Sequence, residues 1–308
     1  MSLRGAFTLL IRIFIILLSI LILYIILDFN KLKIVFSNIN YSPLIFAVAI
    51  YLLAQLVSAQ RFIYVSESLG YSIPFYNSVR VHFIGLWFNN IMPTGLGGDI
   101  IKAGMFKKSM GLSSAITACF LDRGFGMIFM IICTFLQMPL YYFFFGYALT
   151  LTVLLICIVT LTLVALGMIW AKKDLNKTLT FLKWFHIFFN DLNKSFNKKF
   201  LLKQLWVCFI VHFNGIIAYF FIGLSLGISV EAINYVLIVP LIFLTALLPI
   251  SFAGWGLREL SAVALFSLIG VSNELAFTSA VFFGLLSIII GIPGIIFLFF
   301  DKKKIYPN

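Results

Sequence analysis

The chain has 308 residues, of which 63% are hydrophobic and only 10% are charged. So few charged side chains cannot cover the surface of a water-soluble domain of this length, so the composition excludes a soluble globular protein. The net charge of +12 does not indicate nucleic-acid binding, because the basic residues lie mostly between long apolar runs. We therefore predict an integral membrane protein.

Several apolar runs are long enough to cross the hydrocarbon core as helices, which takes about 20 residues. We predict six full spans, at residues 7–27, 43–60, 112–138, 146–170, 201–226 and 276–300. Two further apolar pieces, 78–107 and 232–270, are interrupted by proline and glycine. The predicted fold is an all-α, polytopic helical membrane protein with six full spans and two re-entrant helical hairpins. In the alternative, the interrupted pieces cross the membrane as broken spans.

The basic residues predict the orientation of the chain. They concentrate at both ends and in residues 171–203, where eight lysines outnumber two aspartates. The positive-inside rule places these regions in the cytoplasm, so we expect both termini there. The connections 140–145 and 227–231 contain no lysine or arginine and are expected outside. The two hairpins then enter the membrane from opposite sides.

This orientation makes the order span, span, hairpin, span recur upside down in the second half of the chain. We predict one transmembrane domain, residues 1–308, built from inverted halves at about 1–140 and 141–308. In residues 171–203, apolar side chains recur at helical spacing between lysines. This pattern indicates an amphipathic helix on the anionic lipids of the inner leaflet, with a partly ordered basic loop as the alternative.

The two interrupted pieces share a motif. Each has a proline, a glycine five residues later and a cation nine residues later, namely Pro93, Gly98 and Lys102 in the first and Pro249, Gly254 and Arg258 in the second. Helix breaks expose backbone groups that lipid cannot satisfy, so they persist where they line a cavity enclosed by protein. A glycine-rich turn before a helix also offers N–H groups to a phosphate.

Arg258 is the strongest single candidate for a substrate-binding residue, because it is the only lysine or arginine between Gln204 and Phe300. A cation inside a membrane segment costs about 2.5–3.5 kcal/mol on insertion scales, so it usually faces a cavity or a partner. Pairing with a carboxylate, in a structural role, is the alternative. Glu259 is adjacent, but consecutive residues do not share a helix face, so we do not expect these two to pair.

In the first motif, Asp99 and Lys102 are three residues apart and would share a helix face. Asp99 alternatively caps the helix that follows the break. Asn90 either satisfies the broken backbone or contacts a headgroup. The predicted substrate-binding residues are Asn90, Pro93, Gly97, Gly98, Asp99, Lys102, Pro249, Gly254, Gly256, Arg258 and Glu259.

Three more charged residues are secondary candidates. Arg61 lies at the inner end of the second span, close to the first hairpin. Asp122 and Arg123 follow Leu121 at the beginning of a span, and we interpret them as a local interface pair, since charges at span ends can extend to the interface.

The sequence offers no pattern for metal binding or catalysis. His82, His186 and His212 are scattered, and the four cysteines lack Cys-x-x-Cys spacing. Phosphate-binding loops, Gly-x-Ser-x-Gly elbows and Asp-x-Asp pairs are missing. We predict no metal, no cofactor, no catalytic residue and no enzymatic activity.

The assembled residues resemble a known family, the lysylphosphatidylglycerol synthase transmembrane region. The resemblance covers nearly the whole chain and rests on three groups of residues. In the first, Asn90 and Pro93 lead into Gly97-Gly98-Asp99-x-x-Lys102, and the second is Asp122-Arg123. In the third, Pro249 leads into Gly254-x-Gly256-x-Arg258-Glu259. This flippase-like family includes bacterial and archaeal membrane proteins. Lys102 stands where the family commonly has arginine, and lysine cannot make a bidentate phosphate contact. Asp122 stands where glutamate is common.

The resemblance implies a helical domain, in a prokaryotic cytoplasmic membrane, that moves a lipid or lipid-linked headgroup between leaflets. Fused members carry a separate soluble domain that makes an aminoacylated lipid, and this chain looks like a standalone member without it. We expect a lipid translocase whose Lys102 and Arg258 bind the phosphate of a membrane lipid or a polyprenyl-phosphate-linked substrate.

Two other functions remain open. One is a membrane-embedded enzyme or enzyme subunit acting on lipid-linked sugars, with Glu259 or Asp99 as its carboxylate. The other is a scaffold for a separately encoded synthase. No nucleic-acid partner is expected.

Overall fold

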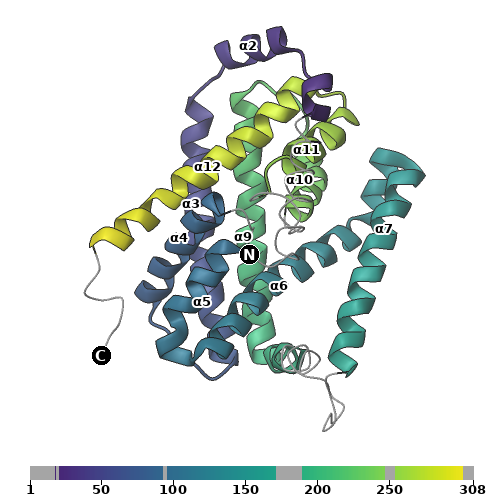
Figure 1. Cartoon of the computed structure of the whole chain (residues 1–308). Coiled ribbons are helices and arrows are strands. Elements are labelled where there is room, and N and C mark those ends of the chain that lie inside the picture. The colour runs from purple at the N-terminus through teal and green to yellow at the C-terminus, as the bar shows by residue number, and fades with distance from the viewer. Residues whose placement is uncertain (1–17, 19–20, 93–95, 171–188, 247–253, 301–308) are drawn as a thin grey trace. The chain divides into compact units, whose positions relative to one another are not determined.

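The computed structural model describes residues 18, 21–92, 96–170, 189–246 and 254–300. These residues form helices joined by short connections (Figure 1). Five of the described helices are long and apolar enough to cross a membrane, namely α3 (Ser42–Ser68), α6 (Leu112–Leu136), α7 (Met138–Trp170), α9 (Lys198–Ser225) and α12 (Asn273–Phe300). They match five of the six predicted spans, and the sixth, 7–27, lies largely outside the described residues. The prediction of a polytopic helical membrane protein is confirmed.

Each interrupted piece consists of two shorter helices. α4 (Phe75–Ile91) and α5 (Gly97–Met110) flank the first break, and α10 (Ala232–Ala246) and α11 (Leu257–Ser267) flank the second. Pro93 and Pro249 lie outside the described residues. The re-entrant topology, the inverted halves and the cytoplasmic termini stay predictions.

The connection predicted at 140–145 is helical instead. α7 already begins at Met138, directly after α6, and Gly146 interrupts its helical geometry with φ 76° and ψ −175°. Glycine adopts a positive φ without a steric penalty, so the chain changes direction here within a kinked helix. Apolarity alone did not reveal this, because residues 140–145 are as apolar as a span.

The chain packs as two compact units. Unit 1 comprises residues 1–54, 83–98 and 213–302, and unit 2 comprises residues 55–82, 99–212 and 303–308. α3, α4, α5 and α9 each contribute residues to both units.

Unit 2 has an apolar core formed mainly by α3, α5 and α6. Phe62 stacks on Phe106 with the ring centroids 5.0 Å apart, and Leu192 is buried in the same core. Phe189 and Phe196 pack against it. The described end of the predicted amphipathic segment therefore packs into unit 2, while residues 171–188 lie outside the described part.

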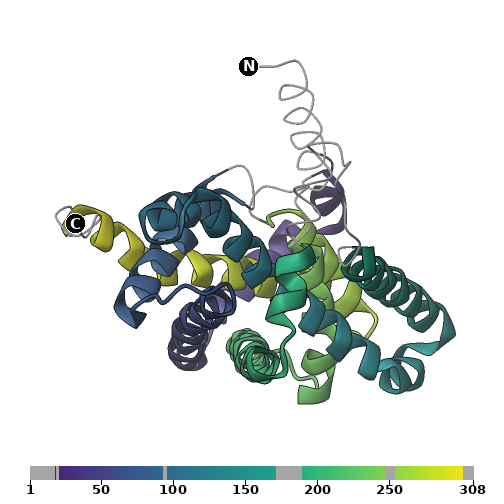
Figure 2. The same cartoon turned by 90° about the horizontal axis from the view of Figure 1, so that it is seen from below.

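Unit 1 is organised around a buried aromatic side chain. Tyr219 of α9 lies within 5.3–6.5 Å, between ring centroids, of Tyr235, Phe243, Phe266 and Phe283. These rings come from α10, α11 and α12, which pack together in chain order, as both views show (Figures 1 and 2). A short helix, α2 (Phe29–Ser37), packs against α12.

Candidate functional site

The larger group of buried charges lies in unit 2 and is called here the unit 2 cluster. Its members are Arg61, Asp99, Lys102, Asp122 and Arg123. Arg61 Nε donates to Asp122 Oδ1 at 2.8 Å, and Lys102 Nζ lies 3.5 Å from Asp122 Oδ2. These three side chains are at most 10% exposed. Asp122 is therefore held between a cation of α3 and a cation of α5.

The remaining two members form a more accessible ion pair. Arg123 Nη2 lies 2.9 Å from Asp99 Oδ2, and their side chains are 22% and 18% exposed. The cluster thus contains three cations and two carboxylates, for a formal charge of 3 − 2 = +1. A buried excess of positive charge favours an anion as a further partner.

Neighbouring groups fix the cations of this cluster. The Lys102 ammonium lies 4.6 Å from the centre of the Phe62 ring, at cation–π distance. Gly126 of α6 faces Arg61, and a Cβ there would lie 2.9 Å from Arg61 Nη1. A glycine at this position leaves room for the guanidinium between α3 and α6.

The interpretation of Asp122 and Arg123 as a local interface pair is wrong, and the N-cap alternative for Asp99 does not hold. Asp99 and Lys102 do not pair with each other, because Asp99 pairs with Arg123 and Lys102 with Asp122. Asp122 and Arg123 are not a local interface pair. They lie well inside α6, with Asp122 buried, and side chains of consecutive helical residues face different neighbours. Asp99 is the third residue of α5, so it lies in the first turn and is not the N-cap.

The second group of charges lies in unit 1 and is called the unit 1 cluster. It comprises Trp255, Arg258 and Glu259. Arg258 Nε and Nη2 donate to Glu259 Oε1 at 2.9 and 2.5 Å, and the two side chains are 8% and 3% exposed. The expectation that these adjacent residues would not pair is wrong. Both lie in the first turn of α11, where Glu259 folds back and its Oε2 accepts from the backbone N–H of Gly256 at 2.6 Å.

An aromatic ring and a glycine position the Arg258 guanidinium. Its Cζ lies 4.4 Å from the centre of the Trp255 ring, at cation–π distance. A Cβ on Gly284 of α12 would overlap Arg258 Nη2 and Trp255, so α12 approaches this closely because residue 284 is glycine. Sequence reasoning missed both residues. An aromatic three positions before a membrane-buried arginine was the available signal for Trp255.

The predicted residues around the first break have structural partners. Asn90 Nδ2 donates to the carbonyl oxygens of Leu86 and Ser287 at 3.0 and 3.2 Å, which ties α4 to α12. The backbone N–H of Gly98 donates to Asn89 Oδ1 at 2.8 Å. Asn90 thus contacts carbonyl oxygens inside α4 and α12, and neither role predicted for it is confirmed. The Asn89 contact shows that one glycine N–H of the predicted phosphate turn is already used.

The predicted site residues therefore fall into separate groups. Asp99 and Lys102 belong to the unit 2 cluster together with the secondary candidates Arg61, Asp122 and Arg123, whereas Arg258 and Glu259 belong to the unit 1 cluster. Gly97 begins α5, and Gly254 and Gly256 precede α11 with φ of 84° and 86°. No group of three or more potential metal ligands occurs among the described residues. Substrate binding by these residues stays a prediction.

Comparison with known proteins gives one match. Neither the curated proteins nor the solved structures include a match to this chain. The family model described as the lysylphosphatidylglycerol synthase TM region matches residues 9–294, nearly the whole chain. The chain therefore belongs to the family of the lysylphosphatidylglycerol synthase transmembrane region.

Proposed function

We propose that this protein is a lipid translocase, which moves a phosphate-bearing lipid or lipid-linked headgroup between the two leaflets of the membrane. The observation that carries the proposal is the formal charge of +1 in the unit 2 cluster, where Arg61 and Lys102 share a single carboxylate. Charged side chains inside membrane segments are costly and are typical of substrate pathways. A phosphate would supply the negative charge that this cluster lacks.

The geometry supports an order of contact with the headgroup. The Arg123–Asp99 pair is the most exposed part of the cluster, so Arg123 meets an incoming phosphate first. Its guanidinium can bind two phosphate oxygens at once, whereas the Lys102 ammonium acts as a point charge. The loose 3.5 Å contact between Lys102 and Asp122 leaves the ammonium able to turn toward the phosphate.

In unit 1, considered by itself, Arg258 is a separate phosphate contact in this proposal. Glu259 occupies its Nε and Nη2, while Nη1 makes no hydrogen bond within the described part of the chain. Stacking on Trp255 holds the guanidinium in place. Movement between leaflets requires the site to open to each side in turn.

The structure offers no support for a catalytic role of Glu259. Oε1 accepts from Arg258 and Oε2 accepts from Gly256, so both carboxylate oxygens are engaged within the first turn of α11. This arrangement favours a transport protein over an enzyme that would use Glu259 as its catalytic carboxylate.

The test is translocation of a fluorescent phospholipid by the purified chain in liposomes, followed by quenching of the label in the outer leaflet. Lys102→Gln and Arg123→Gln should each lower the rate by about tenfold or more, the factor that corresponds to about 1.4 kcal/mol. Lys203→Gln is the matched control, because Lys203 belongs to unit 2 but forms an exposed pair with Glu67.

The outcomes separate the alternatives. If the folded Lys102→Gln and Arg123→Gln proteins keep the wild-type rate, the cluster does not bind the transported headgroup. If the wild-type chain moves none of a panel of phosphate-bearing lipids, the scaffold for a separate synthase becomes the leading interpretation.

A further inference from the structure

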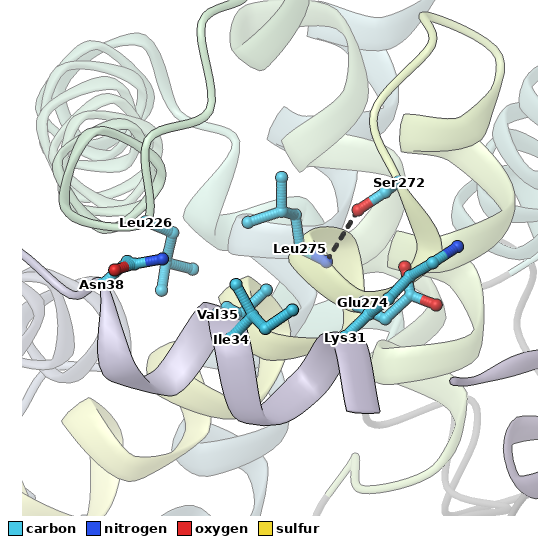
Figure 3. Close-up of a pocket in the computed structure, with 8 residues that line it drawn as sticks. All are labelled: Lys31, Ile34, Val35, Asn38, Leu226, Ser272, Glu274 and Leu275. Carbon is cyan, nitrogen blue, oxygen red and sulfur yellow. Dashed lines mark hydrogen bonds between the residues drawn. The ribbon is translucent and has the colours of Figure 1, made fainter. Parts of the chain in front are cut away.

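Unit 1 contains a pocket of about 240 Å³ that no residue of either charge cluster lines (Figure 3). One wall is the helix α2, and the other walls are the end of α9 and the beginning of α12. The lining residues are Lys31, Ile34, Val35, Asn38, Leu226, Ser272, Glu274 and Leu275. The pocket therefore joins a lysine and a glutamate to several aliphatic side chains.

The helix ends place this pocket at a boundary of the membrane. Leu226 directly follows the candidate span Lys199–Ser225, and Ser272 directly precedes the candidate span Asn273–Phe299. Apolar spans end where the hydrocarbon core meets the headgroup layer. The ends of these candidate spans therefore assign the pocket to the depth that lipid headgroups occupy.

α2 has the character of a helix lying in that layer. It buries Leu32, exposes Phe29, Ile34 and Phe36, and carries exposed lysines at 31 and 33. Exposed apolar side chains beside lysines on a short helix are typical of an interfacial helix.

Two hydrogen bonds donated by backbone N–H groups hold α2 against the ends of the spans. At its beginning, the N–H of Asp28 donates to Glu274 Oε1 at 3.2 Å, and beyond its end the N–H of Asn40 donates to the carbonyl oxygen of Ser225 at 2.9 Å. The wall that carries Lys31 is therefore fixed relative to the wall that carries Glu274.

The two charged groups of the pocket are not neutralised by each other. Within the described residues, Lys31 forms no ion pair, and Glu274 Oε2 has no hydrogen-bond partner although the residue is only 5% exposed. A buried carboxylate with an unused oxygen is stabilised by an approaching cation. Lys31 offers the complementary contact to an anion.

We propose that this pocket binds the headgroup of a zwitterionic glycerophospholipid, with its phosphate at Lys31 and its ammonium at Glu274. Ile34, Val35 and Leu226 contact the glycerol and the first acyl carbons. An anionic lipid without an amine leaves Glu274 uncompensated, and diacylglycerol satisfies neither charge. This site is independent of the proposed translocation site and holds one lipid at the headgroup layer beside α2.

The test is native mass spectrometry of the delipidated full chain, titrated with phosphatidylethanolamine, phosphatidylglycerol and diacylglycerol that have the same acyl chains. The wild-type protein should bind phosphatidylethanolamine most tightly. Lys31→Gln should weaken this binding about tenfold. Lys33→Gln is the matched control, because Lys33 is an exposed lysine of the same helix that does not line the pocket, and it should change binding by less than about twofold.

A second variant tests the amine contact. Glu274→Gln keeps an oxygen that can accept from the Asp28 N–H but removes the negative charge, so it should abolish the preference for phosphatidylethanolamine over phosphatidylglycerol. Equal weakening by Lys31→Gln and Lys33→Gln, or equal binding of the two phospholipids by the wild-type protein, would overturn the proposal. Lys102→Gln should leave the Lys31-dependent lipid binding unchanged. The pocket proposal is therefore tested independently of the proposed translocation.

Discussion

In unit 1, the carboxylate that neutralises Arg258 is supplied by the next residue, whereas in unit 2 the carboxylates that neutralise Arg61, Lys102 and Arg123 lie on other helices. In both clusters a glycine of a long helix, Gly284 or Gly126, leaves room for a guanidinium.

The difference has a mechanical consequence. The Arg258–Glu259 ion pair lies within α11, so the pair itself does not connect α11 to another helix. The Asp122 contacts instead connect α3, α5 and α6, so the unit 2 cluster persists only while those three helices stay together. Breaking the unit 2 cluster should therefore cost more than breaking the unit 1 cluster.

The largest effect is expected for Asp122→Ala. This change leaves Arg61 and Lys102 buried without their shared carboxylate, and removing one partner of a buried pair typically costs about 3–5 kcal/mol. The shift of the thermal unfolding midpoint in detergent measures the loss. An unchanged midpoint would mean that water or lipid already neutralises these cations.

A smaller effect is expected for Glu259→Gln. The single amide oxygen can accept from Gly256 N–H or from Arg258 but cannot replace both carboxylate oxygens, so the loss should be about 2 kcal/mol, within the range of hydrogen bonds that involve charged groups. The double variant Arg258→Gln, Glu259→Gln should be as stable as Glu259→Gln or more so, since it leaves no unpaired charge. A double variant less stable than either single variant would show that each residue has further charged partners.

The third largest loss of stability is expected for Gly284→Ala. The added methyl group overlaps Arg258 and Trp255, and overpacking of this kind typically costs about 1–3 kcal/mol. Gly124→Ala in α6 is the matched control, because a Cβ at residue 124 meets no atom within 4 Å. The two unfolding midpoints should differ clearly, and equal midpoints would argue against the close approach of α12 to the guanidinium.

The smallest effect is expected for Lys203→Gln. Lys203 and Glu67 are 3.8 Å apart and their side chains are about two-fifths exposed, and exposed pairs contribute at most about 1 kcal/mol. The same thermal measurement gives the baseline for the buried variants. If Lys203→Gln lost as much stability as Asp122→Ala, burial would not explain the difference between the buried and the exposed ion pairs.

The sequence by itself determined the class of the protein and the positions of most of its helices. The length of an apolar run decides whether a helix can span the membrane, and proline and glycine act on the backbone next to them. Both effects are local, so five predicted spans correspond to described helices and the two predicted breaks fall between α4 and α5 and between α10 and α11. The resemblance to the family could likewise be recognised from the sequence alone, because it rests on residue types at fixed spacing.

Only the tertiary structure decided which charges meet. Asp99 pairs with Arg123 and Lys102 with Asp122 because α5 packs beside α6, and spacing along one helix contains no information about its neighbour. The contact of Arg258 with Glu259 depends on how side chains fold at the first turn of α11, and the pocket under α2 depends on where α9 ends and α12 begins. A buried charge takes the partner that packing places within reach, and packing depends on contacts between residues far apart in the chain.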